Sequence, residues 1–181
     1  MTETPKRHRN NETKRPGDRK PAPHGRPAKD GRFPARTGKK PKKPTISARR
    51  AAYDSLIRCG RDGKYSNIEI DSVLKKTGLE GAERGFFTTL VYGVIERSLT
   101  LDYAITLVSD KSPDKLDPEV RTILRLALYQ IIFLDRVPES AAVNEAVLLA
   151  KDVMFSSATF VNAVLRGYLR RFGKGTAGLF S

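Results

Sequence analysis

Apolar residues recur at helical spacing from residue 46 onward, whereas residues 1–45 show no periodic pattern. The clearest stripe follows Asp117, Pro118 and Glu119, which supply a capping oxygen, a proline at the first helical position and an acid in the first turn. Its members lie three, four, seven, eight, eleven and twelve residues after the first: Val120, Ile123, Leu124, Ala127, Leu128, Ile131 and Ile132. This spacing predicts the central core helix of a bundle.

Capping residues and glycines delimit the helices that precede this one. Ser47 can cap a helix that runs to Arg58, with Gly60 just beyond its end. The segment Ser66–Glu69 has the form of a capping box, in which a serine oxygen and a glutamate carboxylate satisfy each other's backbone N–H groups. It predicts a second helix, which ends at Gly78.

The remaining helices complete an all-α chain. A third helix begins near Glu80, and a further stretch over 101–108 follows after Ser98, with a kink expected there. Pro138 opens another helix, and residues 157–172 form the last, with an apolar face of Phe160, Val161, Val164, Leu165, Tyr168, Leu169 and Phe172. Since no segment has a convincing strand pattern, the sequence predicts an all-α bundle of six or seven helices.

Residues 1–45 differ from the rest in composition. They hold 15 of the 34 Lys and Arg residues, 4 of the 20 Asp and Glu residues, 8 of the 11 prolines and a single aromatic residue, Phe33. The segment therefore carries +11 of the formal charge of +14, with too little apolar surface to offset the entropy lost on ordering. We predict a disordered basic, proline-rich tail at 1–45, a helical domain at 46–173 and a flexible C-terminus at 174–181.

The helical part offers few groups for catalysis. Both histidines, His8 and His24, lie in the tail, and the acidic pair Asp114 and Asp117 fits helix capping better than a catalytic dyad. Cys59 lies on the inward side of its helix, where a buried core thiol is favoured over a reactive nucleophile. We therefore expect that the chain as it stands is not an enzyme and holds no metal and no cofactor.

The chain shows no sign of export or of membrane insertion. The longest apolar run, near residues 126–134, is interrupted by Gln130 and is far shorter than the roughly 20 residues that a membrane span needs. The N-terminus lacks the apolar core of a signal peptide. These features favour a cytoplasmic protein without a membrane partner.

Basic residues make RNA a candidate ligand, because Lys and Arg side chains neutralise phosphates, although a solvated helix face explains those on the first helix equally well. The candidate RNA-binding residues lie in the tail and on or near the first helix: Lys6, Arg7, Arg9, Lys39, Lys40, Lys42, Lys43, Arg49, Arg50, Arg58, Arg61 and Lys64. For a second group at the end of the last helix, a solvated helix face is favoured over RNA contact: Arg166, Arg170, Arg171 and Lys174. Arg121 and Arg125, one turn apart, are interpreted as structural.

Six strings in the helical part are characteristic of a known family. In order along the chain they are LVYGV at 90–94, LDP at 116–118, LRLALYQ at 124–130, DRVP at 135–138, NEAV at 144–147 and FVNAVLR at 160–166. Together they resemble the all-helical NusB-like domain, in the version at the N-terminus of RsmB-type 16S ribosomal RNA cytosine carbon-5 methyltransferases. The resemblance covers about residues 46–172. The antitermination factor NusB shares the fold and the NEAV and FVN strings.

The resemblance implies RNA binding through the basic start of the first helix, matched here by Arg49 and Arg50. The family strings also include Asn144, Glu145, Asn162 and Arg166, which we interpret first as hydrogen-bonding groups within the bundle. The methyltransferases of this family continue into a domain that binds S-adenosylmethionine and uses two cysteines, whereas this sequence has only Cys59.

Two functions remain open at this point. The first is an RNA-binding module for ribosomal RNA, which corresponds to the N-terminal domain of such a methyltransferase and has a separate catalytic domain as a candidate partner. The alternative is a transcription antitermination factor of the NusB type, which binds RNA together with a ribosomal protein.

Overall fold

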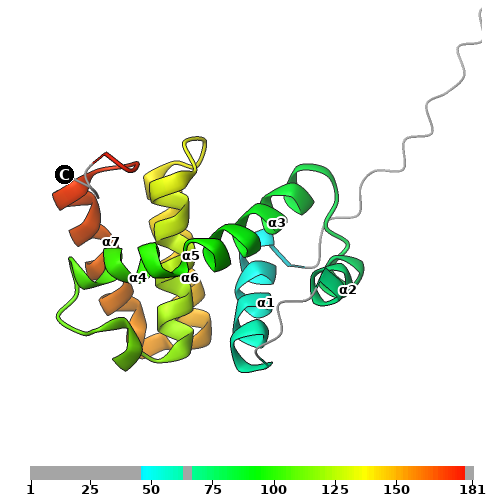
Figure 1. The fold of residues 1–181 in the computed structure, drawn as a ribbon, viewed down its shortest axis with the longest axis horizontal. Coiled ribbons are helices and arrows are strands. Elements are labelled where there is room, and N and C mark those ends of the chain that lie inside the picture. The colour runs from blue at the N-terminus through cyan, green and yellow to red at the C-terminus, as the bar shows by residue number, and fades with distance from the viewer. Residues whose placement is uncertain (1–45, 63–66, 178–181) are drawn as a thin grey trace, which may run out of the picture. The chain divides into compact units, whose positions relative to one another are not determined.

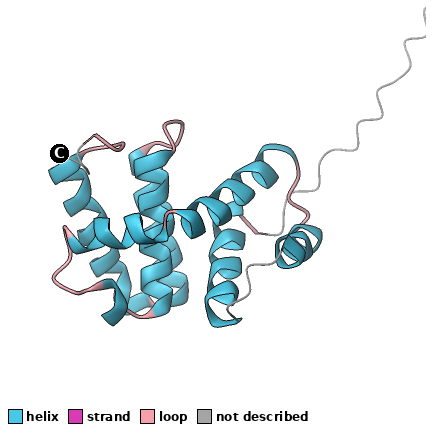
Figure 2. Ribbon diagram, in the orientation of Figure 1, coloured by secondary structure: helices cyan, strands magenta, loops and turns pink. Residues whose placement is uncertain are grey.

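The computed structural model describes residues 46–62 and 67–177, and every regular element within them is helical (Figure 2). Seven α-helices follow one another: α1 (Ala48–Asp62), α2 (Asn67–Thr77), α3 (Gly81–Glu96), α4 (Ser98–Thr106), α5 (Pro118–Phe133), α6 (Glu139–Val153) and α7 (Ala158–Phe172). Short 3-10 turns, η1 (Pro113–Lys115) and η2 (Phe155–Ser157), precede α5 and α7. The predicted all-α bundle is confirmed. The predicted tail, Ser66 of the capping box and the candidate Lys64 lie outside the described residues.

Helix α5 is the centre of the bundle, and it contacts α1, α3, α4, α6 and α7 (Figure 1). The stripe that predicted it is buried throughout, with side chains no more than 3% exposed: Val120, Ile123, Leu124, Ala127, Leu128, Ile131 and Ile132. Apolar faces of the surrounding helices close over this stripe. A single hydrophobic core results, which joins all seven helices.

Helices α3 and α5 pack closely because one position lacks a side chain. Gly93 of α3 is buried and faces the ring of Tyr129 on α5, where an added Cβ atom would overlap the ring. Gly85, in the same helix, has open space around it. The close contact between the two helices therefore depends on glycine at position 93.

The helix ends agree with the predictions only in part. The Ser47 hydroxyl accepts a hydrogen bond from Arg50 N at 3.2 Å, so the predicted cap of α1 is confirmed. The predicted end of α1 before Gly60 is wrong, because the helix continues to Asp62. A glycine inside a helix costs about 1 kcal/mol relative to alanine, which the buried face of α1 offsets.

Two further boundaries concern α3, α4 and α5. The backbone turns at Arg97 (φ −99°, ψ 14°), which separates α3 from α4 next to the kink expected at Ser98. Pro118 begins α5 as predicted, but the exposed side chain of Asp117 makes no capping hydrogen bond. Its backbone carbonyl accepts from Arg121 N at 2.9 Å instead. None of the described helices combines the length and the apolar character needed to cross a membrane.

Candidate nucleic-acid interface

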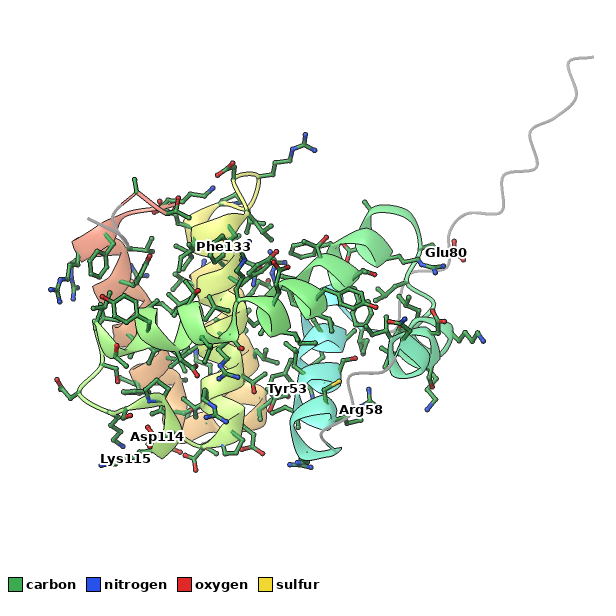
Figure 3. The ribbon with its side chains drawn as sticks, viewed as in Figure 1. Tyr53, Arg58, Glu80, Asp114, Lys115 and Phe133 are labelled. Atoms are coloured by element: carbon green, nitrogen blue, oxygen red, sulfur yellow. The ribbon has the colours of Figure 1, made fainter. Side chains whose placement is uncertain are left out.

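Helix α1 positions four of the predicted RNA-binding residues at its two ends. Arg49 and Arg50 lie in its first turn, and Arg58 and Arg61 lie near its last turn. Figure 3 shows Tyr53 on the side of α1 that faces α5, and Arg58 on another side of the helix. The candidates of the tail, Lys6, Arg7, Arg9, Lys39, Lys40, Lys42 and Lys43, lie outside the described residues, as does Lys64.

Arg49 is tied into the bundle. Its Nε donates a hydrogen bond to Gln130 Oε1 at 2.7 Å, and its guanidinium lies 5.0 Å from the centre of the Phe86 ring. Gln130 is buried on α5, and its Nε2 donates to the Leu126 carbonyl at 2.8 Å. Arg49 therefore joins α1 to α3 and α5 by a hydrogen bond and a cation–π contact.

Arg50 is surrounded by carboxylates. Its Nε donates to Asp54 Oδ1 at 3.1 Å, one turn along α1, and its guanidinium pairs with Asp152 of α6. Burial opposes the charged form, but the Asp152 hydrogen bond and the charge of Asp54 outweigh it and raise the pKa of Arg50. The start of α1 is thus largely charge-balanced, which weakens it as a phosphate-binding surface.

The other end of α1 is more open. Arg61 Nη2 lies 3.2 Å from Glu119 Oε1 at the start of α5, and the Arg61 side chain is 70% exposed. The Glu119 side chain is 25% exposed, but the Arg61 end of the pair lies in solvent, so the pair contributes little free energy and Arg61 can exchange Glu119 for another anion. The same carboxylate influences Tyr53: burial first, and then the charge of Glu119, raise the pKa of Tyr53 to about 12.

A cavity of about 220 Å³ lies beside Arg61, between the end of α1, the α3–α4 junction and the start of α5. Its walls combine aliphatic, hydroxyl and charged side chains: Leu56, Ile57, Gly60, Arg61, Val94, Ile95, Ser98, Pro118, Glu119, Arg121, Thr122 and Arg125. No sequence pattern indicates this cavity, because its walls come from three segments that are far apart in the chain.

Arg125 and Asp102 form a rigid part of the cavity wall. Arg125 Nε lies 2.6 Å from Asp102 Oδ1, and a second guanidinium nitrogen pairs with Oδ2, so the contact is bidentate. Both side chains are largely buried, with 22% and 23% exposed. The structural role predicted for Arg125 is confirmed, whereas Arg121 forms no side-chain hydrogen bond or ion pair with the part of the chain that the structure describes.

The basic group near the end of α7 holds neighbouring loops. Arg171 donates to the Leu107 carbonyl at 2.8 Å, and Lys174 Nζ donates to the carbonyls of Asp135 and Val137 at 2.5 and 2.8 Å. Arg166 donates to Asn162 Oδ1 at 2.9 Å on the exposed surface rather than inside the bundle. Arg171 and Lys174 therefore hold neighbouring loops, whereas the sequence favoured a solvated helix face for the whole group.

Asp114 and Glu83 accept hydrogen bonds from neighbouring groups of the protein, and Cys59 lies inside the bundle. The Ser112 hydroxyl donates to the carboxylate of Asp114, which lowers the pKa of that exposed group. Glu83 accepts a long hydrogen bond, at 3.4 Å, from Ala48 N. Cys59 is buried. Across residues 46–62 and 67–177, no three His, Cys, Asp or Glu side chains are grouped as a metal site would require.

Comparison with known proteins agrees with the fold and the strings. The NusB family profile matches residues 46–170. The solved structure of antitermination factors NusB and NusE in complex with dsRNA contains a chain that matches with a TM-score of 0.61 and 24% identity, over 68% of this chain and 93% of that one. NusB from T. maritima gives the same TM-score at 23% identity, over 68% of this chain and 88% of its own. These structures show the shared fold.

Sequence relatives fall into two groups. Probable ribosomal RNA small subunit methyltransferase B from Synechocystis sp. is 42% identical over 131 residues, which are 72% of this chain and 29% of that protein. The protein of the same name from Bacillus subtilis is 40% identical over 125 residues, 68% of this chain and 28% of its own. This chain thus spans less than a third of these methyltransferases.

The second group consists of antitermination proteins. Transcription antitermination protein NusB from Bacillus licheniformis is 41% identical over 123 residues, which cover 66% of this chain and 91% of that protein. The profile match lies within the helical part of the chain, at residues 46–170. With the seven-helix fold, the buried core stripe of α5 and these matches taken together, the chain belongs to the NusB family.

Proposed function

We propose that this chain binds RNA, and that it corresponds to the N-terminal, RNA-recognising domain of a small-subunit ribosomal RNA methyltransferase. The observation that carries the proposal is the match of the chain, over 125–131 residues, to methyltransferase B proteins at 40–42% identity. Ribosomal RNA is the proposed ligand, and the cytoplasm is the proposed place of action. Methylation itself is assigned to a catalytic domain that would act with this one.

Charge supports an RNA ligand. The exposed residues Arg58 and Arg61 lie near the end of α1, and the segment before α1 carries +11 of the formal charge. Each Lys or Arg that meets a phosphate releases a condensed counterion, so affinity should fall steeply as salt concentration rises.

Deletion of residues 1–45 tests the contribution of the basic segment. We expect the shortened chain to bind a ribosomal RNA fragment more weakly and with a shallower dependence of log affinity on log salt, because fewer phosphates are neutralised. Fluorescence anisotropy across a salt series measures both quantities. Equal affinity and equal slope for the two chains would refute the role of the segment.

The second candidate function is that of an antitermination factor. It is favoured by one observation: the chain covers 91% of the Bacillus licheniformis NusB protein. NusB occurs with NusE and RNA in a solved complex, so a factor of this type would bind a ribosomal protein together with RNA. Affinity purification of the RNA-bound chain separates the two functions. Recovery of a ribosomal protein supports antitermination, and recovery of a methyltransferase catalytic domain supports the first proposal.

A further inference from the structure

The cavity between α1, the α3–α4 junction and α5 has the size and chemistry of a site for a single base. We propose that it holds one unpaired nucleotide of a single-stranded RNA segment, an inference that rests on the proposed RNA-binding function. The cavity volume of about 220 Å³ is smaller than the roughly 300–1,000 Å³ typical of sites for drug-sized ligands. It therefore suits one planar base rather than a larger molecule.

The cavity walls can contact both the flat faces and the polar edge of such a base. Side chains from α1 and α3 give it apolar surface: Leu56, Ile57, Val94 and Ile95. The guanidinium groups of Arg61 and Arg121 offer planes on which a base can stack. The carboxylate of Glu119 can accept hydrogen bonds from the amino group of a base, a contact that a pure phosphate site would not include.

The charges of the cavity favour an RNA strand over other ligands with flat rings. Arg125 is held by Asp102 in a bidentate pair and stays fixed in the wall. Among the described residues, Arg61 forms an ion pair with Glu119 in which the Arg61 side chain is 70% exposed, and Arg121 forms no ion pair. These two arginines are available to the phosphates that flank an inserted base.

An unpaired base can enter this cavity, whereas a paired base is held in its helical stack. RNA-binding proteins commonly bind splayed-out bases of loops and single strands in this way. The proposal therefore predicts that the protein prefers single-stranded RNA to a duplex of the same sequence, and that the preference depends on the cavity.

Two glycines allow a matched test in the full-length chain. Gly60 lines the cavity and Gly85 lies on α3; both are exposed and helical, and an added Cβ meets nothing within 4 Å at either position. Gly60→Leu places a side chain at the cavity, and Gly85→Leu is the control for the same substitution elsewhere. Fluorescence anisotropy with a labelled single-stranded RNA and its duplex, at fixed salt, measures the preference.

We expect Gly60→Leu to weaken binding of the single strand about tenfold, since stacking of one base contributes roughly that factor or more, and to leave duplex binding unchanged. Gly85→Leu should match the wild type on both probes. If the wild type binds RNA and the two leucine variants bind the single strand equally well, the cavity proposal is overturned while RNA binding stands. If the wild type binds neither probe, the proposed function fails as well.

A second pair of variants tests the charged wall independently of the cavity volume. Arg121→Gln removes the cavity arginine that forms no ion pair with the described residues, and Arg136→Gln removes an exposed arginine beyond the other end of α5. We expect Arg121→Gln to reduce the preference for the single strand severalfold more than Arg136→Gln does. Equal effects of the two substitutions would show a general loss of charge and contradict the proposal.

Discussion

The contact between Gly93 and Tyr129 gives the sharpest test of the packing of α3 on α5. Replacement of Gly93 by alanine would place a Cβ atom within the Tyr129 ring, so the ring or the helix must move. The matched substitution Gly85→Ala, two turns earlier in α3, meets nothing within 4 Å. Both changes remove a helical glycine, and only one of them creates a steric overlap.

The expected magnitude follows from two opposing contributions. Alanine in place of glycine stabilises a helix interior by about 1 kcal/mol. Overpacking of a well-packed contact costs about 1–3 kcal/mol. Displacement of the Tyr129 ring also disturbs its contact with Phe133, whose ring centre lies 5.5 Å away. We therefore expect the free energy of unfolding of Gly93→Ala to be about 1–3 kcal/mol lower than that of Gly85→Ala.

Urea denaturation followed by far-ultraviolet circular dichroism measures this difference. The same glycine substitutions in a Tyr129→Ala background complete a double-mutant cycle. Without the ring, Gly93→Ala should become as favourable as Gly85→Ala. If Gly93→Ala stabilises the protein as much as Gly85→Ala while Tyr129 is present, the close contact between α3 and α5 is refuted.

Two further substitutions test the electrostatics. Arg125→Leu should lower the free energy of unfolding by about 1–2 kcal/mol, because it leaves the largely buried Asp102 carboxylate without its partner. Arg61→Ala should change the free energy of unfolding by less than about 0.5 kcal/mol. Equal effects of the two substitutions in chemical denaturation would contradict the difference in burial between the two ion pairs. The pKa of Tyr53 is raised from 10.0 to about 12 in the folded state, so folding favours the neutral phenol. This contribution to the free energy of unfolding is complete below pH 10 and is lost as the pH rises to about 12. Tyr53→Phe should flatten the fall of stability across this range, and an unchanged pH profile would refute the assignment.

Local spacing and capping residues predicted most of the fold. The stripe of α5 is buried along its whole length, and Pro118 begins that helix as expected. The wrong predictions concern helix ends, because a glycine can end a helix or lie inside it, and an aspartate before a helix can cap it or point into solvent. Gly60 is inside α1 because the packing of the helix outweighs the cost of a helical glycine, and Asp117 does not cap because its side chain stays in solvent.

The candidate interface was less predictable, because the partner of a charged side chain lies far away in sequence. Arg49 and Gln130 are separated by 81 positions, and Arg50 and Asp152 by 102. Position in the sequence therefore made Arg50 and Arg61 equal candidates for RNA binding. In the structure, Arg50 contacts the carboxylates of Asp54 and Asp152, whereas the side chain of Arg61 is mostly exposed to solvent. Only the folded arrangement distinguishes a cation that holds the bundle together from one available to RNA.

We infer that the helical bundle binds RNA at the C-terminal half of α1 and the adjoining start of α5. Ultraviolet crosslinking of the full chain to ribosomal RNA, with the crosslinked residues mapped by mass spectrometry, tests it most directly. We predict crosslinked peptides that contain Arg58, Arg61 or Arg121. Failure to form any complex at low ionic strength, or crosslinks that all fall away from these two segments, would contradict the claim.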